Sequence, residues 1–140
     1  MKVLEYRFAI TPIFHFIAIK SMEAGLYLCD GHAKQTVQLL MRDSAFENGK
    51  KRIGAIQYEG SNDYTEKEPC MVSWRFERAL LPDGLKQELE AITAFRRDHN
   101  KGPAINPSAQ SIAFKFDELT DAAKETIEAI TAVLKKYARS

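Results

Sequence analysis

The sequence predicts an α+β fold, in which two or three helices pack on a single, mainly antiparallel sheet of five or six strands. Two patterns carry this prediction. Apolar residues alternate with polar ones in short segments such as 111–116, which is the period of a half-buried strand. Near the C-terminus they recur at steps of three and four from Ala123 to Tyr137, which is the spacing of an amphipathic helix. The 140 residues contain no repeat or linker, so we expect one domain over residues 1–140.

The N-terminal part is predicted to contain three strands. Residues 3–10 alternate between apolar and polar side chains, which indicates a half-buried strand. The segment 13–19 is apolar on both alternating faces, with His15 as its polar exception, and this predicts a central strand covered on both sides. Residues 25–29 predict a further strand, which ends at an Asp-Gly turn.

Residues 33–46 fit two structures. A helix is favoured because apolar side chains sit at helical spacing, at Ala33, Val37, Leu40 and Met41. A strand is the alternative, because residues 47–50 read Glu-Asn-Gly-Lys, a good hairpin turn. In that strand Gln35 and Leu39 would share a face with Val37, which is poor alternation.

Two more strands are predicted at 52–58 and 69–78. In the second, one face is a clean apolar stripe, formed by Cys70, Val72, Trp74 and Phe76. That stripe is expected to face the core.

Two helices are predicted in the second half of the chain. One begins at residue 84, with Leu85, Leu89 and Ile92 as its inward stripe. The other begins at residue 118, and Asp117 is expected to cap it.

The composition excludes several classes of protein. The formal net charge is +1, which disfavours wide nonspecific nucleic-acid binding. No apolar run approaches the length of a membrane span, and the N-terminus does not read as a signal peptide, so we expect a cytoplasmic protein without membrane contact. The two cysteines, Cys29 and Cys70, lie in apolar settings and are interpreted as buried free thiols.

A cysteine, a carboxylate and a histidine lie close together in residues 29–32, which read Cys-Asp-Gly-His. Such groups can bind a metal or activate a thiol. A zinc site would need further ligands from Cys70 and from His15 or His99, none of which is paired with another ligand in the sequence. The turn explains Asp30 and Gly31, so we expect no metal, no cofactor and no catalytic residues here.

The polar, acidic stretch 59–68 is predicted to be an exposed loop. Tyrosine offers a large contact area with a polar tip, and carboxylates attract a basic partner. The candidate partner-binding residues are Tyr58, Glu59, Asp63, Tyr64, Glu66 and Glu68.

A second hypothesis places a ligand pocket between sheet and helices, lined by His15, His32 and Trp74. It would make the chain a small-molecule-binding protein or a small enzyme. A third hypothesis is nucleic-acid binding by basic groups, namely Lys50-Lys51-Arg52, Arg96-Arg97 with His99 and Lys101, and Lys135-Lys136 with Arg139.

The sequence favours a small non-catalytic protein that acts through protein–protein interaction, such as an inhibitor, an immunity protein or a complex subunit. A homodimer is also expected, because the strand predicted at 13–19 needs cover that a second copy would supply.

Overall fold

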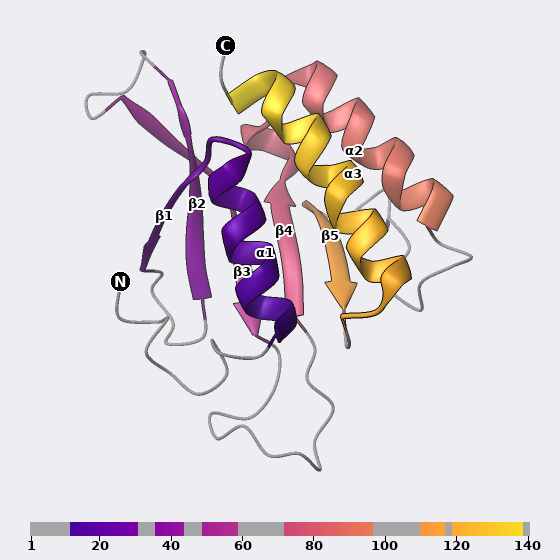
Figure 1. Cartoon of the computed structure of the whole chain (residues 1–140). Coiled ribbons are helices and arrows are strands. Elements are labelled where there is room, and N and C mark those ends of the chain that lie inside the picture. Colours follow the sequence, from indigo (N-terminus) through magenta and orange to yellow (C-terminus); the bar gives the residue numbers. More distant parts are fainter. Residues whose placement is uncertain are drawn as a thin grey trace.

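The computed structural model describes residues 12–30, 36–43, 49–58, 72–96, 110–116 and 119–138, and it covers side chains only up to residue 92 in the fourth range. Five strands form one antiparallel sheet, and three α-helices pack on one of its faces (Figure 1). The predicted α+β class is confirmed.

The strands follow one another across the sheet in the order of the sequence, β1-β2-β3-β4-β5, and each is antiparallel to its neighbours. The predicted strand at 3–10 lies outside the described residues. The other four predicted strands after residue 24 are confirmed, and one further strand is present. The bounds are β1 Tyr27–Asp30, β2 Thr36–Arg42, β3 Lys50–Tyr58, β4 Val72–Glu77 and β5 Ser111–Phe116.

The helices are α1 Pro12–Glu23, α2 Asp83–Arg96 and α3 Asp121–Ala138, and a short 3-10 helix, η3, spans Arg78–Leu80. The helices predicted from residues 84 and 118 are therefore confirmed. The cap of α3 is Thr120, whose Oγ1 accepts a hydrogen bond from the Ala123 N–H at 3.1 Å. The predicted cap, Asp117, lies outside the described residues.

The strand predicted at 13–19 is wrong, because this segment belongs to α1. Its buried residues fall at helical spacing and form one stripe, Ile13, Phe14, Ile17, Ala18 and Ser21. Pro12 is the first residue of the helix, where its missing N–H breaks no bond. Gly25, with φ of 102°, follows the helix and lets the chain turn into β1. The argument for a dimer from a strand that needs cover therefore falls away.

The helix favoured for residues 33–46 is also wrong, because residues 36–42 form β2. Val37, Leu39 and Met41 are buried and alternate with more exposed residues, as expected for a strand with one face on the core. The strand pairs with β1 on one side and with β3 on the other. The turn to β3 is closed by a hydrogen bond from the Asp43 N–H to the Gly49 carbonyl. The hairpin alternative was correct.

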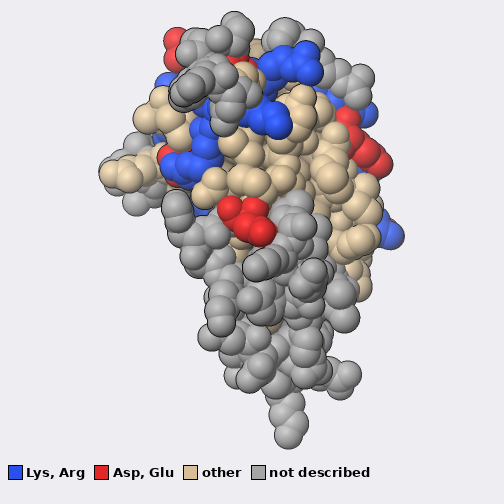
Figure 2. Space-filling view, turned by 90° about the vertical axis from the view of Figure 1, so that its left-hand side faces the viewer, with Lys and Arg blue, Asp and Glu red and all other residues tan. Residues whose placement is uncertain are grey.

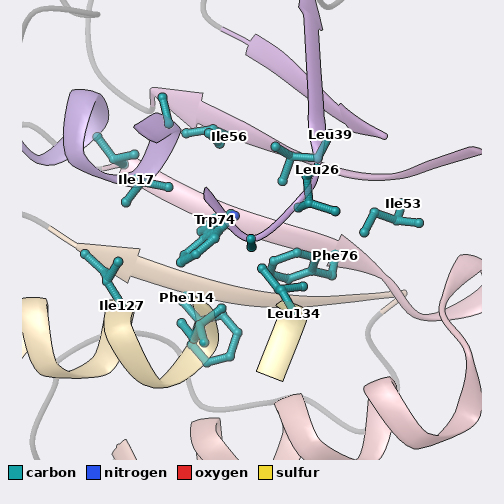
Figure 3. Close-up of a cluster of buried hydrophobic side chains, with 14 of the residues drawn as sticks. Ile17, Leu26, Leu39, Ile53, Ile56, Trp74, Phe76, Phe114, Ile127 and Leu134 are labelled. Carbon is teal, nitrogen blue, oxygen red and sulfur yellow. The ribbon is translucent and has the colours of Figure 1, made fainter. Parts of the chain in front are cut away.

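We call the three helices α1, α2 and α3 the helix layer. The core lies between the sheet and the helix layer (Figure 3). Trp74 and Phe76 of β4 lie with ring centroids 5.7 Å apart, and Phe76 meets Phe114 of β5 edge to face at 6.4 Å. Ile17 from α1, and Ile127 and Leu134 from α3, come down onto these rings. The apolar stripe predicted in β4 is confirmed for its described members, Val72, Trp74 and Phe76.

The opposite face of the sheet, which we call the outer face, carries a different set of side chains. Residues paired across neighbouring strands share a face, so the register defines it. The central row of the outer face runs across all five strands through Cys29, Gln38, Ala55, Arg75 and Ala113.

An irregularity in β3 shapes one end of this face. Leu39 pairs with Gly54 while Leu40 pairs with Arg52, so Ile53 is the extra residue of a β-bulge. A Cβ on Gly54 would lie 2.0 Å from the Arg75 carbonyl oxygen, so only glycine allows β3 and β4 to approach this closely. The bulge leaves Ile53 buried and keeps Arg52 on the outer face.

Candidate functional site

Basic side chains gather around a tyrosine at the end of the outer face nearest the β2–β3 turn. Arg42 pairs with Lys50, and Leu40 pairs with both Arg52 and Tyr27, so all of these residues share one face. We call Arg42, Lys50 and Arg52 the basic cluster. Figure 2 looks onto the β1 edge of the molecule, and blue side chains gather there toward the end that carries the turn.

Tyr27 connects two members of the basic cluster. Its hydroxyl accepts a hydrogen bond of 3.2 Å from Arg42 Nη2, and Lys50 Nζ lies 4.3 Å from the centre of its ring. The hydrogen bond from Arg42 lowers the pKa of the tyrosine hydroxyl, and the charges of Arg42 and Lys50 lower it further. A positive field at Tyr27 explains both effects.

Glu77 is a carboxylate next to the basic cluster. Arg52 donates to its Oε1, and the two side chains are 42% and 39% exposed. The pair is accessible to solvent, so it contributes little to stability, but it fixes the direction of the Arg52 guanidinium. Arg75 is held in a similar way, by a hydrogen bond of 2.9 Å to Gln57 Oε1.

The outer face and the helix layer differ in charge. Among the described side chains, the strands place a single carboxylate, Glu77, on the outer face, against the five cations Arg42, Lys50, Arg52, Arg75 and Lys115. In the described parts of α1, α2 and α3, carboxylates outnumber lysines, and several are paired with them, as in Lys20–Glu128 and Lys136–Glu88. Although the formal net charge of the chain is only +1, its described side chains therefore make the outer face basic.

Cys29 lies in the central row of the outer face. Its thiol donates to Gln38 Oε1 at 3.6 Å. Burial raises the pKa of this thiol, and the neighbouring Asp30 raises it further, which keeps the sulfur protonated and a poor nucleophile. Asp30 pairs with Val37, so it belongs to the other face of the sheet. His32 lies outside the described residues.

The predicted partner-binding residues divide between the core and the part of the chain that is not described. Tyr58 packs in the hydrophobic core and is 1% exposed. Glu59, Asp63, Tyr64, Glu66 and Glu68 lie outside the described residues.

The two described residues of the predicted pocket do not meet at a shared surface. Trp74 is fully buried against Phe76, whereas His15 is exposed on α1.

The predicted basic groups are separated by the sheet. Lys50 and Arg52 lie on the outer face, whereas Lys51 pairs with Met41 and takes the opposite register. Lys135 and Lys136 end α3 in the helix layer, where Lys136 binds Glu88 of α2 at 2.7 Å. The other members of those groups have no described side chains.

Within the described ranges, no three His, Cys, Asp or Glu side chains come together as a metal site would require. The described helices are each too short or too polar to cross a membrane.

Sequence reasoning missed Tyr27 and Arg42 as site residues. Both depend on β2 being a strand, because only the hairpin pairs Arg42 with Lys50 and brings Tyr27 beside them. The Asn-Gly pair at 48–49 in the sequence was the signal that could have indicated this hairpin.

Comparison of the chain with protein-family models, with curated proteins and with solved structures found no match.

Proposed function

We propose that this chain is a small non-catalytic binding protein, which acts through protein–protein interaction and presents the outer face of its sheet to the partner. The observation that supports this is the one-sided arrangement of the fold. All three helices pack on one face of the sheet, while the other carries a row of half-exposed, mostly short side chains across five strands (Figure 1).

The composition of the outer face fits a protein interface. Its central row contains one cation, Arg75, and is otherwise neutral, with Ala55 at the middle strand, and the other cations lie toward the ends of the strands. Protein interfaces commonly have a centre depleted in charge and a polar rim. Arginine is also among the residues enriched at such interfaces.

The test is capture of a partner from nuclease-treated lysate of the source organism by the intact protein and by two matched variants. Ala55→Trp adds bulk at the centre of the outer face, and Ala129→Trp adds the same bulk on the exposed side of α3. Circular dichroism would verify that both variants fold.

We expect one stoichiometric protein to be retained by the parent chain and by Ala129→Trp, and to be lost with Ala55→Trp. Retention by both variants would contradict use of the outer face. Loss only when Glu66 and Glu68 are reversed to lysine would move the interface to the loop predicted from the sequence.

A further inference from the structure

The basic cluster has the features of a built recognition site. Its three cations come from two neighbouring strands, so their backbone positions are fixed by the pairing of β2 with β3. Tyr27 engages two of them and Glu77 engages the third. Side chains that are already held lose less conformational freedom when a ligand binds.

The cluster is accessible. Arg42 is exposed, and Arg52 keeps 42% of its side-chain surface in contact with solvent. A guanidinium has five N–H donors in a fixed fork, so the single bond from Arg42 to Tyr27 leaves a group that still matches a carboxylate.

We propose that the basic cluster recognises a carboxylate-rich segment of the partner protein. This inference rests on the proposed function and names the chemistry of the partner. Carboxylates meet the cations on the outer face and meet repulsion from the helix layer, where the described glutamates and aspartates outnumber the lysines. Complementary charge of this kind selects the partner and orients its approach.

The same observations favour a protein over a nucleic acid. Surfaces for single-stranded nucleic acids combine cations with aromatic rings on which bases stack. Here Tyr27 is the described aromatic residue of the outer face, and Lys50 already lies over its ring.

The experiment measures binding of a fluorescent poly-glutamate peptide by anisotropy, with a single-stranded oligo-thymidine of similar length as the second probe. The intact chain is compared with Arg42→Glu/Lys50→Glu. The matched control is Lys124→Glu/Lys135→Glu, which makes the same change in net charge at two exposed lysines of α3.

We expect the intact chain and the control to bind the peptide, and binding to weaken as salt is raised. The cluster variant should bind about tenfold or more weakly, because two favourable charge contacts become repulsive. If that variant does not fold, Arg42→Gln/Lys50→Gln should show a smaller loss in the same direction.

Equal loss in the control, or no binding of the peptide to the intact chain, would overturn the inference. Tighter binding of the oligonucleotide than of the peptide would overturn it in favour of nucleic acid. The proposed function fails separately, if Ala55→Trp retains the captured protein. If Ala55→Trp loses that protein while the basic-cluster variant keeps it, the binding function holds and the acidic partner does not.

Discussion

The two faces of the sheet are built from alternate residues of the same strands, yet they obey different constraints. Trp74 and Arg75 are neighbours in β4. Trp74 points into the core and packs on Phe76, whereas Arg75 lies half-exposed on the outer face and bonds to Gln57. The core side is stabilised by the packing of buried side chains, whereas the outer side carries half-exposed polar and charged side chains that contribute little to stability. Substitutions on the two sides should therefore separate stability from binding.

The largest expected effect is the loss of Trp74. Trp74→Ala removes a fully buried ring and leaves a cavity, so we expect the free energy of unfolding to fall by about 3–5 kcal/mol. Arg75→Ala, one residue away, should cost about 1 kcal/mol or less, because it removes one part-buried hydrogen bond. Urea denaturation measures both, and similar losses would contradict the division between the faces.

Gly54 tests the close contact between β3 and β4. Gly54→Ala would place a Cβ 2.0 Å from the Arg75 carbonyl oxygen, so the strands must move apart. We expect a loss of about 1–3 kcal/mol by thermal or urea unfolding. The control is Ala55→Ser at the next, half-exposed position, where about 0.5 kcal/mol or less is expected. If Gly54→Ala left stability to unfolding unchanged, the bulge would accommodate the added Cβ at no measurable cost, and the prediction would be wrong.

Thr120 tests the start of α3 in the helix layer. Thr120→Ala removes the acceptor of the Ala123 N–H and should cost about 1 kcal/mol. Thr120→Ser keeps the hydroxyl and should recover most of that loss. If serine were no better than alanine, the hydroxyl would not be the cause.

The smallest effect is expected at the contact between α2 and α3. Glu88 accepts hydrogen bonds from Lys136 and from the Tyr137 hydroxyl, and these bonds hold the pKa of the Glu88 carboxyl below its ordinary value. A carboxyl whose pKa falls on folding stabilises the fold above its unfolded-state pKa, and this contribution is lost as the pH drops through the folded-state pKa.

Glu88→Gln should therefore lower Tm slightly at neutral pH and should match the parent chain in acid. Melting curves across that pH range provide the measurement. A difference in Tm that persists unchanged into acid would show that the charge of Glu88 is not responsible.

The sequence predicted those elements whose apolar pattern has a single period. β5 and α3 each bury one regular stripe, β4 buries its apolar stripe together with Ser73, and α2 buries Leu85 and Leu89. Each of these elements was identified. The pattern fails for α1, because exposed Ile19 and Met22 add apolar residues outside its buried stripe and hide the helical period. In β2, Leu40 adds an apolar residue to the outer face and imitates a helix.

The basic cluster was only partly predictable, because it is assembled by strand pairing. Lys50 and Arg52 were identified as a basic group from their proximity in the sequence. Tyr27 and Arg42 join them through pairing across β1, β2 and β3, which requires the correct assignment of β2. An error in one element therefore removed half of the site from view.

The sequential order of the strands also has a kinetic consequence. Each strand pairs with the one before it in the chain, so the sheet can grow by adding one strand at a time, without waiting for distant segments to meet. Among neighbouring strands, the pairing of β5 with β4 closes the longest connection, because α2 lies between these two strands. The β1–β3 part, which carries the basic cluster, is therefore expected to form early during folding, and the closing step is the arrival of β5 and α3.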